Sequence, residues 1–368
     1  MNYVALLESC WQEHLQPRAK NAPTVISTFA GCGGSSLGYS MAGFRELLAV
    51  EWDDNAVKTF ALNFPDVPIY HGDVAKLSVQ ECLDRAHIQP RELDVFDGSP
   101  PCQGFSTAGK RMIDDPRNQL FREYVRLLRG LQPKVFVMEN VSGMVKGKMK
   151  LVFVEILQEL KASGYQVSAR LLNAIYFNVP QSRERMIFIG VRNDLNIAPS
   201  HPKAESNPIV LREAWKDVPR ESAPRLSPKL ASIISSIPVW GDGGDVTGSF
   251  FSTKRLDFNQ SSRTLIKGNV GSRACYVHPS ENRAITEAEA KRIQTFPDEY
   301  QFVGGYKMSM ERIGNSVPPL FMRSIARHIR HEILEHGKQE NIGQNTDQKA
   351  RASANKSKVA RQSRAAVS

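Results

Sequence analysis

Residues 99–106, Ser-Pro-Pro-Cys-Gln-Gly-Phe-Ser, are the stretch of this chain best suited to chemistry. They follow an apolar run at residues 93–96 that is typical of a buried strand, so Cys102 stands just past a strand's carboxyl end. In open α/β sheets, ligands and reacting groups collect at that edge. Pro100 and Pro101 fix the backbone φ angle and remove two amide donors, so the strand cannot continue. A thiol on this stiff platform suits a nucleophile, although a lone cysteine is more often a small buried hydrophobe.

A glycine-rich turn follows the first predicted strand, at residues 25–29. Residues 29–34 are Phe-Ala-Gly-Cys-Gly-Gly, and they open into a predicted helix at residues 35–41. Glycines at a strand-to-helix turn let a ligand approach the backbone closely. The third glycine of the dinucleotide fingerprint is absent, because Ser36 stands in its place. The turn therefore indicates a ligand site, but not one for a dinucleotide.

Two further strand ends carry groups that fit an adenosine. Glu51 ends the second predicted strand and could bind the two hydroxyls of a ribose, while Trp52 offers a flat face for adenine. Asp73 ends the third and could accept from an exocyclic amine. Core packing for Trp52 and a helix cap for Asp73 are the structural alternatives. S-adenosylmethionine, an adenosine cofactor without phosphates, fits the set, since Phe29 could face its sulfonium.

A carboxyl group and two guanidinium groups are predicted near Cys102. Glu139 follows the apolar residues 135–138, a predicted strand beside the one that precedes Cys102. Arg183 and Arg185 lead into a further predicted strand. A thiol, a carboxyl and two arginines at one sheet edge are not what a structural core needs. The set therefore predicts a reaction site.

Short β-branched runs alternate with amphipathic stretches up to about residue 191, which predicts an α/β fold: a mostly parallel sheet with helices on both faces. From residue 194 to residue 280 the chain is rich in proline and glycine and shows no sustained helical period, as in a smaller, loop-rich domain. Helical character returns at residues 286–296 and 318–336. The predicted strands are 25–29, 47–50, 67–70, 93–96, 135–138 and 185–191, and the other predicted helices are 35–41, 55–64, 117–131 and 149–162.

Composition limits the class of protein. The 368 residues are 41% hydrophobic and 23% charged, as in soluble globular proteins, and no apolar stretch reaches membrane-spanning length. Five cysteines without a Cys-x-x-Cys pair favour reduced thiols in the cytoplasm, and argue against disulfides or a zinc site. The net charge is +10. It suggests a polyanionic partner, nucleic acid first, about as strongly as it suggests a merely solubilising surface.

Eight blocks of this chain, in order, resemble those of the DNA cytosine-5 methyltransferase family, in its prokaryotic restriction–modification or orphan form. The Pro-Pro-Cys, Glu-Asn-Val and Gly-Asn-Ser-Val-Pro blocks together are highly specific. Residues 261–265 match a family block only approximately, and Ala108 stands where some members carry a polar residue. The matching blocks are residues 29–34, 51–52, 72–74, 100–106, 139–141, 181–185, 292–297 and 314–318.

The resemblance implies methyl transfer from S-adenosylmethionine to carbon 5 of a cytosine that is flipped out of a specific duplex sequence. The Cys102 thiolate would add to carbon 6 and make carbon 5 nucleophilic. Glu139 would hold and help protonate the ring nitrogen, and Arg183 and Arg185 could hold the base carbonyl or a phosphate. The implied cofactor-binding residues are Phe29, Gly31, Gly33, Gly34, Glu51, Trp52, Asp73, Val74, Pro100, Leu120, Asn315 and Ser316.

The resemblance also implies a Rossmann-like methyltransferase sheet and a division of the chain. Residues 1–22 would be an N-terminal extension, 23–193 with 281–338 the catalytic domain, 194–280 a target-recognition domain, and 339–368 a disordered basic tail. Residues 104–117 could form a lid over the flipped nucleotide. The candidate DNA-binding residues are Gln103, Ser106, Lys110 and Arg111 in or beside that lid, with Lys254 and Arg255, which on charge alone are equally well solvated surface cations.

Double-stranded DNA is the expected partner, with a cognate restriction endonuclease as a second protein acting on the same sequence; we expect a monomer without metal. Two alternatives share the scaffold. One is a transfer-RNA cytosine-5 methyltransferase, a branch that commonly shows a Cys-Phe-Thr tripeptide absent here. The other is a catalytically silent DNA-binding relative, against which the intact Cys102 and Glu139 blocks argue.

The tail generates a first prediction. Residues 341–368 carry six cations and one anion, a net +5, without a leucine or an aromatic residue. Such a segment cannot bury enough apolar surface to fold alone. Removing everything after His336 should leave the methylated sequence unchanged. If the tail binds phosphates, its removal lowers the logarithmic salt slope of DNA binding by about 0.9 for each phosphate that it neutralises. Identical slopes for the full-length and truncated proteins would mean a solubilising tail.

Overall fold

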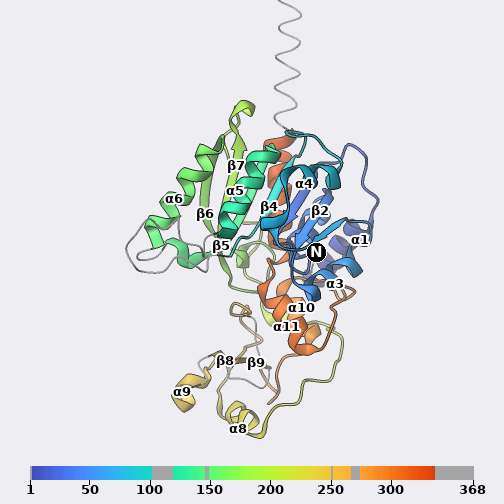
Figure 1. Cartoon of the computed structure of the whole chain (residues 1–368). Coiled ribbons are helices and arrows are strands. Elements are labelled where there is room, and N and C mark those ends of the chain that lie inside the picture. Colours follow the sequence, from blue (N-terminus) through green and yellow to red (C-terminus); the bar gives the residue numbers. More distant parts are fainter. Residues whose placement is uncertain (1, 102–118, 146–148, 250–251, 267–273, 336–368) are drawn as a thin grey trace, which may run out of the picture.

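The computed structural model describes residues 2–101, 119–145, 149–249, 252–266 and 274–335. Within these ranges, seven strands form one sheet in the order β3-β2-β1-β4-β5-β7-β6 (Figure 1). The strands are β1 (Thr24–Thr28), β2 (Arg45–Glu51), β3 (Ile69–His71), β4 (Val95–Gly98), β5 (Val135–Val141), β6 (Tyr165–Asn173) and β7 (Glu184–Arg192). The strands from β3 to β5 pair in parallel, and β7 pairs antiparallel with both β5 and β6. The predicted mostly parallel α/β sheet is confirmed.

Strand β6 is absent from the sequence prediction. It lies at the sheet edge, and several of its side chains are exposed or half-buried. Polar residues Gln166, Ser168 and Arg170 interrupt its apolar run. An edge strand with one face exposed to solvent needs apolar residues only at alternate positions. Its hydrophobic sequence pattern is therefore weaker than that of the central strands.

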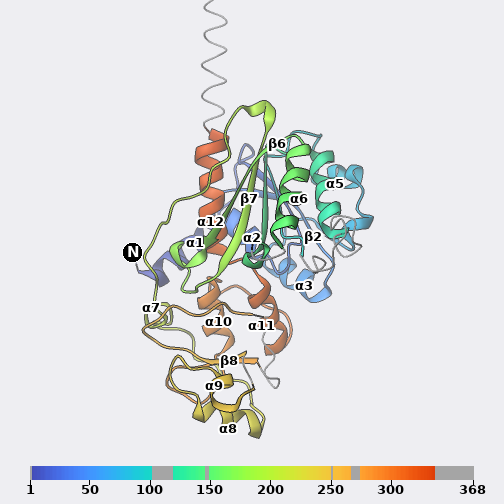
Figure 2. The same ribbon diagram turned by 90° about the vertical axis from the view of Figure 1, so that its left-hand side faces the viewer.

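Helices cover both faces of the sheet because successive strand residues point to opposite sides. Val25 packs into one core with α1 (Tyr3–Leu15), α2 (Gly34–Met41) and α12 (Pro319–His328), whereas its neighbour Ile26 packs into a second core. That second core is built with α4 (Val79–Ala86), α5 (Gln119–Leu131) and α6 (Met149–Ala162). Figure 2 shows the two layers on either side of the sheet. The sheet's alternating apolar side chains thus hold two helical layers.

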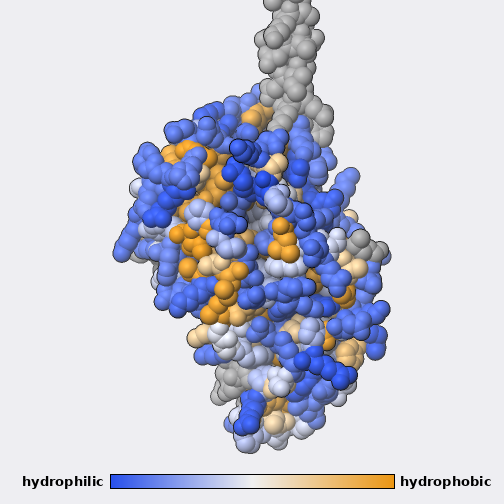
Figure 3. Space-filling view, turned by 90° about the vertical axis from the view of Figure 1, so that its right-hand side faces the viewer, coloured by the Kyte–Doolittle hydropathy of each residue, from blue (hydrophilic) through white to orange (hydrophobic). Residues whose placement is uncertain are grey.

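One more helix, a π-helical turn and several 3-10 turns complete the part of the chain around the sheet. Helix α3 (Asp54–Asn63) follows β2, and a π-helical turn (Ile329–Glu335) extends α12. The 3-10 turns are Val74–Lys76, Ser142–Val145, Ala174–Tyr176 and Asn193–Leu195. None of the helices in the described ranges is long and apolar enough to cross a membrane. The face of the molecule seen in Figure 3 is mostly hydrophilic, and its apolar side chains lie in separate groups.

Residues 194–280 lie mostly beyond one end of the sheet, at the bottom of Figure 1. Their described part is rich in loops, as predicted, but it also contains short helices that the sequence pattern did not indicate. The elements are α7 (Leu211–Ala214), α8 (Pro228–Ser236), α9 (Gly243–Thr247) and a parallel pair of strands, β8 (Ser252–Arg255) and β9 (Ala274–Val277). Helices α10 (Glu287–Gln294) and α11 (Tyr306–Asn315) lie between this part and the sheet. Thr286 and Glu289 form a capping box at the start of α10.

The N-terminal helix α1 is packed into the first of the two cores. Tyr3, Leu7 and Cys10 of α1 are almost fully buried, and Trp11 is 9% exposed. The Trp11 ring meets the Tyr300 ring edge-on at 6.3 Å, and the Tyr3 hydroxyl donates to the carbonyl of Arg292. Residues 1–22 therefore include a structural helix rather than a loose leader.

This packing generates a prediction. Trp11→Ala should lower the free energy of unfolding by about 3–5 kcal/mol, because it removes a large side chain from a packed core. Leu15→Ala on the same helix is the matched control: Leu15 is 54% exposed, and surface changes of this kind usually stay within about 0.5 kcal/mol. Urea unfolding of both variants measures the difference. Equal small effects would show that α1 adds little to the fold.

Candidate functional site

The carboxyl ends of the parallel strands bring the sequence-predicted residues to one edge of the sheet. The strand order reverses between β1 and β4, and this is the topological switch point at which doubly wound folds bind ligands. Strand β7 runs antiparallel to β5, so it begins where β5 ends. Val141 pairs with Arg185, and Glu139 pairs with Ile187. The register therefore places the start of β7 beside the end of β5.

The turn after β1 is shaped by close packing. Phe29 has a φ of 56°, a left-handed conformation uncommon for a bulky residue. A Cβ on Gly34 would lie 2.5 Å from the carbonyl oxygen of Val317 and 3.0 Å from Cβ of Ser316. Glycine at position 34 is thus required because the block at residues 314–318 lies directly against this turn. The glycine loop and that late block form one structure.

Glu51 at the end of β2 is held by backbone amides. Its Oε2 accepts from the Gly31 N–H at 2.8 Å, and its Oε1 accepts from the N–H groups of Trp52 and Asp53, both at 2.9 Å. A carboxylate has about four acceptor positions, so Oε2 retains one. Glu51 is only 9% exposed, and the three amide bonds fix the orientation of its carboxylate.

Core packing for Trp52 and a helix cap for Asp73 are the structural alternatives to cofactor binding, and the structure shows only the second. The Trp52 side chain is 77% exposed, so it does not pack in the core. Asp73 does cap a helix, since its Oδ1 accepts from the Ala75 N–H at 3.0 Å in the 3-10 turn that begins with Val74. The cap uses one carboxylate oxygen and leaves Oδ2 for another partner. Val74 itself is buried.

Glu139 and Arg185 form an ion pair at the end of β5. The Arg185 Nε lies 2.6 Å from the Glu139 Oε1, and the two side chains are 14% and 12% exposed. The neighbouring Asn140 is buried, and its Nδ2 donates to the carbonyl of Pro100 at 3.2 Å. This bond ties the end of β5 to the chain that leaves β4. Sequence reasoning gave Asn140 no role, although the Glu-Asn-Val block contains it.

Arg183 lies inside the protein and does not join that ion pair. It is 2% exposed and donates to the carbonyls of Leu265 and Gly314, at 3.0 and 3.1 Å. Burial lowers the pKa of Arg183 to about 9, because the charged form loses its hydration. Its Nε has no hydrogen-bond partner among the described residues. The two arginines of this block therefore occupy different environments.

A buried acid lies beneath the site. Asp97 on β4 is 4% exposed, and its Oδ1 accepts from the Tyr39 hydroxyl at 3.2 Å. Burial raises the pKa of Asp97, and the nearby carboxyl of Glu46 raises it further. An acid at the end of an otherwise apolar strand was a visible sequence signal for a buried polar group, which the prediction passed over.

The late block places Asn315 and Ser316 at the end of α11. Asn315 is exposed, whereas the Ser316 hydroxyl donates to the Arg312 carbonyl at 2.7 Å and lies 3.1 Å from the Cys32 sulfur. Pro100 is buried at the end of β4, and Leu120 is half-buried in the first turn of α5, against the core cluster that also contacts Phe29. The predicted site residues Cys102, Gln103, Ser106, Lys110 and Arg111 lie outside the described residues.

Arg255 corrects a sequence expectation. Its guanidinium donates to the carbonyls of Ile234, Ile237, His278 and Glu281 and to the Asn282 side chain, and the residue is 5% exposed. Those bonds occupy the donors that a phosphate would need, so Arg255 is a structural residue and not a DNA contact. Lys254 is ion-paired with Asp242 and partly exposed.

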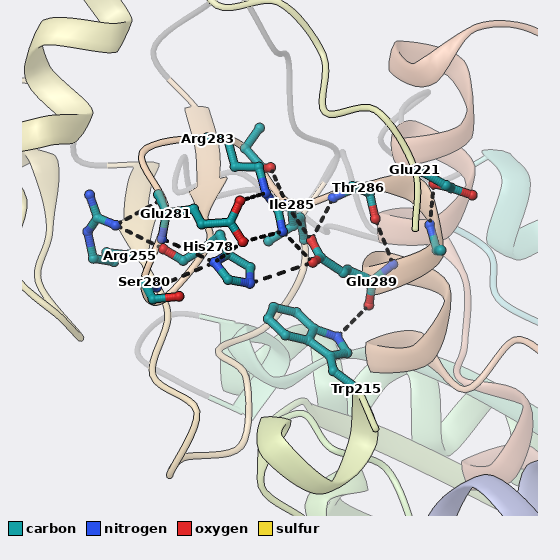
Figure 4. Close-up of polar contacts among 12 residues, drawn as sticks. Trp215, Glu221, Arg255, His278, Ser280, Glu281, Arg283, Ile285, Thr286 and Glu289 are labelled. Atoms are coloured by element: carbon teal, nitrogen blue, oxygen red, sulfur yellow. Dashed lines mark hydrogen bonds and ion pairs between the residues drawn. The ribbon is translucent and has the colours of Figure 1, made fainter. Parts of the chain in front are cut away.

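Figure 4 shows how Arg255 fits into the junction with α10. Arg283 bridges Glu281 and Glu289, and the His278 ring stacks on Trp215 with 5.6 Å between centroids. The Trp215 indole donates to the Glu289 carbonyl. Burial lowers the pKa of His278, which favours its neutral form in this stack. The junction is a satisfied polar network that fixes the smaller part against the catalytic core.

Comparison with known proteins gives consistent results. The family model described as C-5 cytosine-specific DNA methylase matches residues 23–331. The chain is 35% identical over 332 residues to Type II methyltransferase M1.HphI of Haemophilus parahaemolyticus, covering 83% of this chain and 86% of that one. It is 32% identical over 356 residues to Type II methyltransferase M.Eco47II of Escherichia coli, covering 89% and 83%.

Solved structures agree with the fold. A prophage-encoded E. coli protein described as a DNA modification methyltransferase matches with a TM-score of 0.72 and 26% identity, over 85% of this chain and 99% of that one. Spodoptera frugiperda DNMT2 shares the fold with a TM-score of 0.61 at 19% identity, over 84% of this chain and 99% of that one. The chain belongs to the C-5 cytosine-specific DNA methylase family and is a DNA (cytosine-5-)-methyltransferase.

Proposed function

We propose that this enzyme uses S-adenosylmethionine to methylate carbon 5 of a cytosine flipped out of a specific duplex sequence, through a covalent Cys102 adduct. The observation that carries the proposal is the convergence at one sheet edge. The Glu139–Arg185 pair ends β5, and Asn140 binds the Pro100 carbonyl two residues before Cys102. A reacting base at that edge would meet a carboxyl beside the chain that carries the thiol.

The residues at the ends of β1, β2 and β3 fit the adenosine part of the cofactor. The free acceptor position of Glu51 would take a ribose hydroxyl, and the exposed Trp52 would stack on adenine. Asp73 Oδ2 would accept from the adenine amine, and Phe29 would face the sulfonium. When bound, the cofactor supplies an electrophilic methyl group.

The chain's own residues would perform the remaining steps. The Cys102 thiolate would form a bond to carbon 6 and make carbon 5 nucleophilic, so that carbon 5 could accept the methyl group that bound S-adenosylmethionine would supply. Glu139 holds and helps protonate the ring nitrogen, which stabilises the adduct. The proton on carbon 5 would then pass to water and the ring-nitrogen proton would return to Glu139, so that the thiolate is expelled and the aromatic ring is restored. Arg185 would keep the Glu139 carboxylate oriented, because it pairs with that group at 2.6 Å.

The biological setting is part of the proposal. Relatives named Type II methyltransferases cover most of the chain, which supports a bacterial cytoplasmic enzyme that marks the target sequence of a partner restriction endonuclease. Residues 194–280 would read that sequence. Sequencing the methylated positions in DNA from an expressing strain identifies the target. Incubation with labelled S-adenosylmethionine and either duplex DNA or transfer RNA separates the two substrates, and label transferred to transfer RNA in place of DNA would support the alternative.

One prediction concerns the covalent step. Cys102→Ser should abolish methyl transfer but leave cofactor and DNA binding largely intact, because a hydroxyl is a far weaker nucleophile at neutral pH. A duplex with 5-fluorocytosine at the target should trap the wild-type protein, since fluorine blocks the final elimination, and it should not trap the variant. Turnover on ordinary DNA without any trapping would contradict the role of Cys102.

A second prediction concerns the cofactor. Trp52→Ala and Glu51→Ala should each weaken cofactor binding by about 1–3 kcal/mol, the usual cost of losing a stacked ring or a charged hydrogen bond. Saturating cofactor should restore most of the rate with Trp52→Ala. Calorimetric titration measures the affinity, with Leu62→Ala, a 53% exposed residue on α3, as the control. Unchanged affinity in both variants would refute the adenosine site.

A further inference from the structure

Both backbone polar groups of Leu265 are bound by side chains from the block at residues 181–185. The Leu265 N–H donates to the Gln181 Oε1 at 2.9 Å, and the Leu265 carbonyl accepts from Arg183 at 3.0 Å. Gln181 and Leu265 are both at most 1% exposed. Water therefore does not compete for these bonds. Loss of either bond would leave a buried polar group of Leu265 without a partner, which destabilises the folded protein.

The same two side chains lead to the late block of the cofactor site. Arg183 donates to the Gly314 carbonyl at 3.1 Å. The Gln181 Nε2 donates to the Gln294 Oε1 at 2.6 Å, and the Gln294 Nε2 donates to the Ser316 carbonyl, also at 2.6 Å. We call Gln181 and Gln294, which connect the Leu265 N–H to the Ser316 carbonyl, the glutamine relay.

Chemistry fixes the direction of the relay. A backbone N–H only donates and a backbone carbonyl only accepts. The Leu265 N–H therefore requires the Gln181 oxygen, which turns the Gln181 amide nitrogen toward Gln294. The Ser316 carbonyl requires the Gln294 nitrogen, which turns the Gln294 oxygen toward Gln181. One arrangement of the two carboxamides satisfies all these groups, so the relay is a specific connection between its two ends.

One end of the relay belongs to the segment 261–265, which lies within the proposed recognition part, residues 194–280. Ser262 pairs with Gln181 in a parallel bridge, and the Ser182 N–H donates to the Ser262 carbonyl. Arg263 lies over the Trp240 ring at 4.6 Å and faces Asp242 at 3.6 Å. The segment 261–265 thus contacts the rest of the recognition part, at Trp240 and Asp242, on one side and the relay on the other.

The opposite end lies at the cofactor. Ser316 packs on the glycine turn, where its Cβ would be 3.0 Å from a Cβ at Gly34, and its hydroxyl lies 3.1 Å from the Cys32 sulfur. A shift of the Ser316 carbonyl therefore moves the wall of the turn that holds the cofactor. Gln294 belongs to the block at residues 292–297, which has no role in the catalytic steps proposed above.

We infer that Gln181 and Gln294 are positioning residues that couple DNA engagement by residues 194–280 to cofactor affinity at residues 314–316, through the contacts of the segment 261–265 with the relay. The inference rests on the proposed function, because it requires that the late block contact the cofactor. Breaking the relay should leave both ligands able to bind separately. It should remove the effect that each has on the other, since such coupling is reciprocal.

The experiment measures S-adenosylhomocysteine affinity with and without the duplex that the wild-type protein methylates. Coupling between binding sites is typically about 5- to 150-fold, and we expect the wild type to lie in that range. For Gln181→Met and Gln294→Met, which keep the side-chain size and lose the amide, the ratio should fall toward 1. At saturating cofactor, kcat should change little, while KM for S-adenosylmethionine rises.

Asn63→Leu is the matched control. Asn63 is also a buried carboxamide, bonded to the Thr59 and Gln301 carbonyls and the Gln301 N–H, but it lies outside the relay. The Asn63→Leu substitution should lower the melting temperature and leave unchanged the ratio of S-adenosylhomocysteine affinities with and without the duplex. If Gln294→Met does not fold, Gln294→Glu replaces it, because the carboxylate keeps the bond from Gln181 and loses the donor to Ser316.

Two results would overturn the inference: a wild-type ratio near 1, or relay variants that lower the melting temperature while the ratio stays at its wild-type value. Failure of the proposed function has a different signature. In that case the wild-type protein would neither bind S-adenosylhomocysteine nor methylate DNA, whatever residues occupy positions 181 and 294.

Discussion

The pairing of β5 with β7 is the constraint on which the candidate reaction site depends. It is antiparallel, so the beginning of one strand meets the end of the other, and its register sets Val141 opposite Arg185. Because strand side chains alternate with a period of two, a slip of one residue would turn Arg185 to the opposite face and leave Glu139 without its cation. A carboxylate and a guanidinium that are both largely buried need each other in that environment. The parallel part of the sheet brings Glu139 to the edge, and the antiparallel return of the chain provides its partner.

The glycine turn after β1 depends on contacts between residues that are far apart in the sequence. Gly34 near the start of the chain lies against Ser316 and Val317 near its end, and Tyr300 donates its hydroxyl to the carbonyl of Cys32. The shape of the turn after β1 therefore depends on contacts with the segment that runs from α10 to α12. In the sequence, the loop-rich residues 194–280 stand between the sheet and this segment. If those residues recognise DNA as proposed, the segment that completes the turn also adjoins the part that binds DNA.

Sequence patterns predicted the centre of the fold well and its periphery less well. The apolar runs that form β1, β2, β4 and β5 are buried on both faces of the sheet. Their place in the fold therefore agrees with the strand preference of their local sequence. Strand β6 has one exposed face and was missed for that reason. Positions at strand ends could be predicted for Glu51, Trp52 and Glu139 because parallel strands share one edge. Partners could not be predicted: nothing local in the sequence distinguishes Arg185, paired with Glu139, from Arg183, bound to two carbonyls.

Arg255 shows why charge alone locates a nucleic-acid surface poorly. A guanidinium carries five donors in a fixed plane, and the same geometry that suits phosphate also suits several backbone carbonyls left over at loop ends. A loop-rich domain has many such carbonyls, because few of them are used in helices or sheets. Arg255 satisfies four of them, and Lys254 and Arg263 both face the single carboxylate of Asp242. In a domain of this kind, arginines in the sequence therefore first indicate how the loops are held together. Contacts with DNA have to be sought among cations whose donors the fold leaves exposed.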